Sequence, residues 1–193
     1  MQHEINIGVF DWGQFAVGGG YYPDDLPAEW QLAYFANDFG CACLRLSDYN
    51  QSPDLLMELC EDLPATFYLA LLIDAQPTAA VWDMLAELSV HALVIDDDIY
   101  PKLAEQLATP DVLLADTVTL KASAVLAPGD ATRAQRCVIL TDIENLRATR
   151  QWIDSWAKHW RDSDGALNLW LDAAQTTPQQ LFDLRAMLEL MGY

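Results

Sequence analysis

Short apolar runs alternate along the whole chain with longer segments in which apolar residues recur at helical spacing. The helical segments begin near Pro27, Pro53, Pro77, Asp98, Asn145 and Pro178. The apolar runs predict strands at residues 5–10, 41–47, 66–73, 91–95, 112–115, 137–141 and 167–171. Strands that alternate with helices are typical of a parallel sheet covered by helices, so we expect an α/β fold built from a β/α repeat.

Two stretches do not follow this pattern. Residues 13–22 contain a run of three glycines and are expected to form a loop, because the glycine spacing does not match that of a phosphate-binding motif. Residues 117–136 contain either a short strand at 123–126 or an irregular crossover. No linker, repeat or low-complexity segment divides the chain, so residues 1–193 are expected to form a single domain.

Each of the seven predicted strands ends in aspartate. The aspartates that follow the strands are Asp11, Asp48, Asp74, Asp96 to Asp98, Asp116, Asp142 and Asp172. Aspartate is common after a strand because its carboxylate caps the next helix, and each residue is explained individually in this way. The carboxyl ends of parallel strands nevertheless share one edge, where ligands bind in such folds. The sequence therefore predicts an acidic binding edge.

The charge of the chain restricts its partners. Lys and Arg number 10 against 29 Asp and Glu, and the formal net charge is −19. This balance argues against binding to nucleic acid or to an anionic membrane, since both need basic residues. It favours a small cationic ligand or a basic protein. The chain has no apolar run of transmembrane length and no recognisable signal peptide, so a cytoplasmic location is expected.

The cysteines do not indicate a metal site. Cys41 and Cys43 are separated by a single residue, and neither Cys60 nor Cys137 provides a second pair with zinc-ligand spacing. We expect buried free thiols, no bound metal and no cofactor.

The segment YYPDDLPAEWQLAYFANDFGCACL at residues 21–44 resembles the YecE-like family, domain-of-unknown-function family 72. Gly8, Trp12, Tyr22-Pro23, Tyr34-Phe35 and Phe39 occupy positions of the family pattern. The resemblance implies a TIM-barrel-like fold. Members are longer, however, and the resemblance implies that one β/α unit is absent between Leu69 and Val94. The resemblance thus implies a shortened and divergent member, with seven to eight strands in a barrel that is either complete or incomplete.

The departures from the family pattern all affect the strand ends. Cys43 and Arg45 stand where the family has Glu and Asn, and Leu72 replaces a lysine. Asp96-Asp97 replaces an Arg-His pair, and Asp142 lies in the segment that replaces Arg-Leu-His-Gly. A mouth that is cationic in the family would therefore be acidic here, which implies that family-type binding is lost.

Two functional hypotheses remain open. The first is a degenerate family member that acts as a non-catalytic binding or interaction protein. The second is a hydrolase-like enzyme that uses paired carboxylates, with or without a divalent metal. No histidine follows a predicted strand, so a histidine base is not expected. The candidate ligand-binding residues are Asp11, Trp12, Arg45, Asp48, Asp96, Asp97, Asp116, Asp142 and Asp172. Arg45 either pairs with an aspartate or binds an anionic group.

Overall fold

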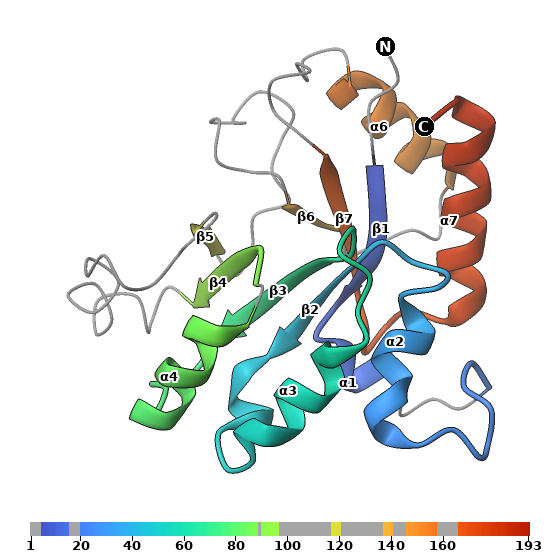
Figure 1. The fold of residues 1–193 in the computed structure, drawn as a ribbon. Helices are drawn as coiled ribbons and strands as arrows, with labels where there is room; N and C mark the ends of the chain where they lie inside the picture. The colour runs from blue at the N-terminus through green and yellow to red at the C-terminus, as the bar shows by residue number, and fades with distance from the viewer. Residues whose placement is uncertain are drawn as a thin grey trace.

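The computed structural model describes residues 5–15, 20–88, 90–96, 117–120, 137–140, 146–157 and 166–193. Within these ranges the protein is an α/β structure (Figure 1). Its strands are β1 (Ile5–Phe10), β2 (Cys41–Arg45), β3 (Tyr68–Ile73), β4 (Ala92–Asp96), β5 (Thr117–Leu120), β6 (Cys137–Leu140) and β7 (Leu167–Asp172). Every pairing between these strands is parallel, which confirms the α/β class and the parallel sheet.

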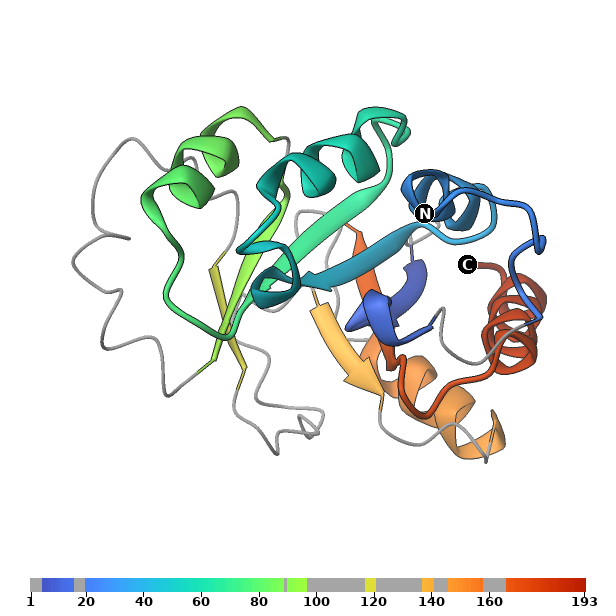
Figure 2. The same ribbon diagram turned by 90° about the horizontal axis from the view of Figure 1, so that it is seen from below.

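The sheet follows the order β5-β4-β3-β2-β1-β7-β6. The first strand, β1, therefore pairs with both the second strand, β2, and the last described strand, β7. All other neighbouring strands in the sheet are consecutive along the chain. Viewed from below, the sheet is curled and the helices lie on its convex side (Figure 2). This arrangement is a partial barrel.

The helices begin largely where the sequence signals predict. They are α1 (Trp12–Phe15), α2 (Gln31–Phe35), α3 (Pro53–Glu61), α4 (Ala79–Glu87), α6 (Leu146–Ala157) and α7 (Pro178–Met191), with 3-10 turns η2 (Ala28–Trp30) and η3 (Leu46–Tyr49). Thr177 forms a capping box with Gln180 at the start of α7, and the Thr78 side chain caps α4. Among the described residues, no helix is long and apolar enough to span a membrane.

Two expectations about the elements need correction, and two others fall on residues that the structure does not describe. A loop was expected at residues 13–22, but the first part of this segment, up to Phe15, belongs to the helix α1. The helix expected to begin near Pro27 is divided into the 3-10 turn η2 and the short helix α2, which ends at Phe35. The strand predicted at 112–115 and the short strand considered at 123–126 lie outside the described residues, whereas β5 occupies 117–120.

The two faces of the sheet form separate apolar clusters. The convex face packs under the helices through residues such as Val9, Leu44 and Leu71. The concave face is filled by the buried side chains of Cys41, Cys43, Ala70, Leu72, Val94 and Trp170. Alternate residues of a strand point to opposite faces, so each strand contributes to both clusters. Burial on both sides explains why these strands are almost continuously apolar.

Gly8 of β1 lies at a very close approach to the neighbouring strand β2. In the sheet register it lies between Cys41 of β2 and Trp170 of β7. A Cβ atom at this position would collide with the carbonyl group of Cys41. The Cys41 thiol also reaches across β1 to the carbonyl of Leu169, with an Sγ–O distance of 3.9 Å. Only glycine leaves room for this approach of β2 and β7.

Candidate functional site

An arginine links the carboxyl ends of three adjacent strands. Arg45 ends β2, while Asp11 follows β1 and Asp74 follows β3. Arg45 Nη2 donates to Asp11 Oδ2 at 2.6 Å, and Nε donates to the same oxygen at 3.2 Å. Arg45 Nη1 donates to Asp74 Oδ2 at 3.0 Å. Together with Ser47 and Asp48, these residues are termed the carboxyl-edge cluster.

Asp74 is held on both of its carboxylate oxygens. The Ser47 hydroxyl donates to Asp74 Oδ2 at 2.8 Å, and the Ser47 backbone N–H donates to Oδ1 at 3.3 Å. Ser47 is part of η3, the turn directly after β2. Asp74 was predicted as part of the acidic edge but was not among the candidate ligand-binding residues, and Ser47 was in neither set. The sequence does not indicate that β2 lies beside β3 and that its Arg45 is the partner of Asp74.

Asp11 combines backbone strain with an unpaired oxygen. Its φ angle of 60° lies in the left-handed region, and its side chain is buried, with a residue exposure of 8%. Asp11 Oδ1 is buried and has no hydrogen-bond partner among the described residues. Both features cost free energy, and such features concentrate at functional sites. Asp11 is therefore the residue of the cluster least explained by stability alone.

Asp48 is the exposed carboxylate of the cluster. Partial burial raises its pKa above the ordinary 3.8, and the nearby charges of Asp11 and Asp74 raise it further, while Arg45 acts in the opposite direction. Its Oδ2 lies close enough to α1 that a Cβ atom on Gly13 would be 3.3 Å away. The cluster thus holds three carboxylates against one guanidinium, and the excess negative charge lies nearest to solvent at Asp48.

No other basic residue from the first half of the chain can compensate these charges. Arg45 is the only Lys or Arg among residues 1–101. In the described part of the remaining chain, Arg150 pairs with Asp154 on α6, and Arg185 pairs with Asp38 and Glu189. Among the described residues, the strand ends of β1, β2 and β3 therefore form a strongly acidic surface in which Arg45 is the paired cation.

The other predicted site residues have different outcomes. Asp172, at the end of β7, accepts hydrogen bonds from the Ala174 N–H at 3.1 Å and the Gln175 amide at 2.8 Å, so it acts as a turn residue. Trp12 is 5% exposed and packs in the core under the helices. Asp96 is the last residue of β4. Three further candidates lie outside the described residues, namely Asp97, Asp116 and Asp142.

The described part of the chain places neither a metal-binding group nor a histidine at this edge. No set of three His, Cys, Asp or Glu residues is arranged to hold a metal ion within the described ranges. His91 precedes β4 at the opposite, amino edge of the sheet, where its Nδ1 accepts the Leu69 N–H at 3.3 Å. Burial lowers the pKa of His91. The thiols of Cys41 and Cys43 are buried and that of Cys60 is half-buried, and none of these three cysteines is part of a disulfide.

Comparison with known proteins leaves the chain without an assigned family. No protein-family model matches it, and no curated protein matches it. The resemblance to the YecE-like family therefore stays a prediction, and the function must be argued from the geometry of the cluster.

Proposed function

We propose that this protein is a non-catalytic binding protein whose acidic carboxyl edge holds a cationic ligand or a cationic group of a basic protein. The observation that carries the proposal is the Asp11–Arg45–Asp74 bridge. Here the protein already holds one guanidinium between two carboxylates, and the exposed carboxylate of Asp48 stays available for a second cation.

The same geometry argues against an anionic ligand. Three N–H groups of Arg45 are engaged by Asp11 and Asp74, and an anion would have to compete with both carboxylates for the guanidinium. The surrounding negative charge would also repel an anion before contact. Of the two roles predicted for Arg45, pairing with the aspartates is the one supported by these distances.

A non-catalytic role is favoured by the pKa of Tyr49, the residue next to the cluster. General acid–base catalysis needs a positioned group whose pKa lies near the working pH. Tyr49, which follows Asp48, is buried, and burial raises the pKa of its hydroxyl well above 10. The alternative, a hydrolase-like enzyme, is favoured by one observation: Asp48 has a raised pKa and lies near the charge of Asp11. In such an enzyme, Asp48 would act as the acid.

We also propose that the sheet closes into a TIM-barrel-like structure and that the chain is a divergent YecE-like protein. The consecutive strand order and the pairing of β1 with β7 support closure, because only β5 and β6 have a free edge among the described strands. The aromatic residues that carry the resemblance also pack together. The ring centroids of Tyr22 and Tyr34 are 5.9 Å apart, and those of Phe35 and Phe39 are 4.9 Å apart.

A thermal-shift screen tests the proposed function. Arginine amide, spermidine, Mg²⁺ and Ca²⁺ are titrated against the protein, with succinate and phosphate as anionic controls. We expect saturable stabilisation by at least one cation and by neither anion, since a ligand that binds only the folded state raises the melting temperature.

Parallel assays with phosphatase and glycosidase substrates test the alternative. Turnover that is lost in Asp48→Asn would establish the hydrolase-like enzyme instead.

A further inference from the structure

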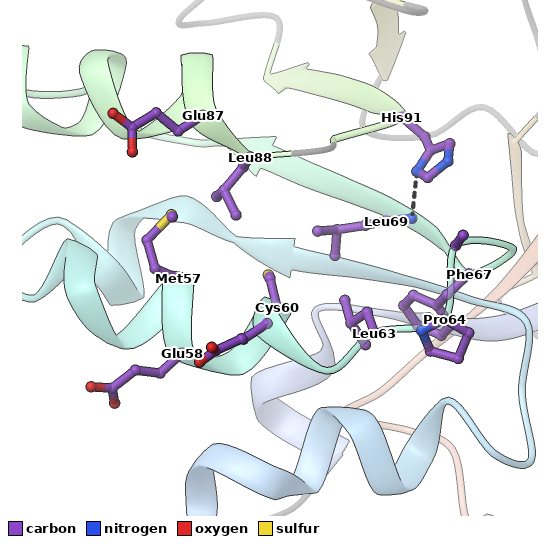
Figure 3. Close-up of a pocket in the computed structure, with 12 residues that line it drawn as sticks. Met57, Glu58, Cys60, Leu63, Pro64, Phe67, Leu69, Glu87, Leu88 and His91 are labelled. Carbon is purple, nitrogen blue, oxygen red and sulfur yellow. Dashed lines mark hydrogen bonds between the residues drawn. The ribbon is translucent and has the colours of Figure 1, made fainter.

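A groove of about 830 Å³ lies between α3 and α4, near the amino ends of β3 and β4 and thus opposite the carboxyl-edge cluster (Figure 3). Phe67 and Leu69 line its buried part, with exposures of 3% and 2%. The half-buried side chains of Met57, Leu63 and Leu88 line it from α3, from the loop before β3 and from the end of α4. These residues give the groove an apolar part that is open to solvent.

The groove also has three carboxylates among its lining residues. Glu58 and Glu61 lie in the last turn of α3, and Glu87 is the last residue of α4. The carboxyl end of a helix carries a partial negative charge, so acidic residues are unfavourable there. Neither helix has a basic residue in its last turn to offset this charge. Two helix ends and three glutamates therefore concentrate negative potential at one place.

These glutamates have no counter-ion within the described structure. None of the described residues forms an ion pair with Glu58, Glu61 or Glu87. Residues 46–101, which include both helices, contain no Lys or Arg. The helices that form the groove therefore provide no positive side chain to offset its negative electrostatic potential, and a bound cation would offset it.

We propose that this groove binds a basic amphipathic helix of a partner protein. Apolar side chains at helical spacing would occupy the surface formed by Phe67, Leu69 and Leu88, as in other helix-in-groove complexes. Lys or Arg residues beside them would pair with the glutamates and with the carboxyl ends of α3 and α4. Met57 suits such a contact because its flexible side chain adapts to different partners. This inference does not depend on the cation site at the opposite edge.

Other occupants fit the groove less well. Nucleic acid and small anions would meet the three glutamates without a Lys or Arg among the lining residues to contact. A second copy of this chain would bring a further net charge of −19 and be repelled. A basic helix is the occupant that satisfies both the apolar surface and the carboxylates.

The test uses a fluorescein-labelled model peptide of about 14 residues, roughly 21 Å long as a helix, made of Leu and Lys with all leucines on one face. Fluorescence anisotropy at physiological ionic strength reports its binding to the full chain. We expect the peptide to bind at least about tenfold more tightly than a scrambled peptide of the same composition, which has the charge but no apolar face. Equal binding of the two peptides would overturn the proposal.

Two variants locate the binding. Glu58→Lys/Glu61→Lys/Glu87→Lys should weaken it more than about tenfold, whereas the control Asp24→Lys/Asp25→Lys/Glu29→Lys, with the same change in charge at exposed positions elsewhere, should change it less than about threefold. Met57→Asp adds negative charge but removes an apolar contact, so we expect about tenfold weaker binding. Equal losses in the two triple variants, or tighter binding by Met57→Asp, would show non-specific attraction and refute the groove as the site.

Discussion

At the scale of single residues, Asp11 shows how the site departs from what folding alone requires. A left-handed backbone, a buried carboxylate and an unpaired oxygen occur together at the end of β1. Arg45 offsets part of this cost by pairing with Asp11 Oδ2. The guanidinium is thus structurally required by the carboxylates on either side of it.

Replacing Arg45 should therefore destabilise the protein strongly. Arg45→Met leaves the buried Asp11 carboxylate without its partner, and we expect the free energy of unfolding to fall by about 3 kcal/mol. Urea denaturation near neutral pH measures the change. Arg185→Met is the control, because its ion pairs with Asp38 and Glu189 are exposed and should contribute less than about 1 kcal/mol. Similar losses in both variants would contradict the assigned role of Arg45.

Asp48 should make the stability depend on pH in a defined direction. Its pKa is raised in the folded state, so the folded protein holds this proton more tightly than the unfolded chain does. The stability contributed by Asp48 is consequently lost as the pH rises from 3.8 through the raised pKa. Asp48→Asn should melt at a higher temperature than the wild type near neutral pH, and the difference should vanish below that range. A lower melting temperature at neutral pH would disprove the direction of the shift.

At the scale of elements, the sequence signals predicted most helix starts and the strands of the first half of the sheet. β1 was predicted with its observed bounds, because its apolar run ends cleanly at Asp11. The Thr177-Pro178 pair likewise predicted the start of α7 at Pro178. The short helix α1 was missed, since a helix of four residues has no periodicity to detect. The position of β5 was also missed, because several short apolar runs near residue 117 compete as strands.

The two Pro-initiated helices provide a matched test of capping. Thr177 accepts a hydrogen bond from the Gln180 N–H, whereas the side chain of Ser52 makes no capping hydrogen bond at the start of α3. Thr177→Ala should thus lower the free energy of unfolding by about 1 kcal/mol, and Ser52→Ala by less than about 0.5 kcal/mol. Chemical denaturation of the two variants compares them. An equal or greater loss in Ser52→Ala would show that the caps are wrongly assigned.

At the scale of the whole molecule, strand order brings together residues that are far apart in sequence. The aspartates that follow the seven predicted strands were expected to share an edge, but their partners could not be predicted. Only the adjacency of β1, β2 and β3 reveals that Arg45 joins Asp11 to Asp74, and that Asp172 has a separate local role. The groove between α3 and α4 was not predicted, since no local pattern reports how far apart two helices pack.

Gly8 tests the curled shape of the sheet. Gly8→Ala places a Cβ atom against the backbone of Cys41, and the sheet must open at β1 to admit it. We expect a loss of at least about 3 kcal/mol in the free energy of unfolding, or no folded protein. Gly13→Ala is the control, because its Cβ would meet only the Asp48 side chain at 3.3 Å. A stable Gly8→Ala protein would contradict the close approach of β2 to β1.

The central claim is that the carboxyl edge binds a cation through Asp48, and isothermal titration of arginine amide tests it most directly. The wild type and Asp83→Asn, which loses an exposed carboxylate on α4, should show saturable binding at one site. Asp48→Asn should bind about tenfold more weakly, as expected for the loss of one close charge pair. Equal affinity in all three proteins, or no binding to the wild type, would contradict the proposed function.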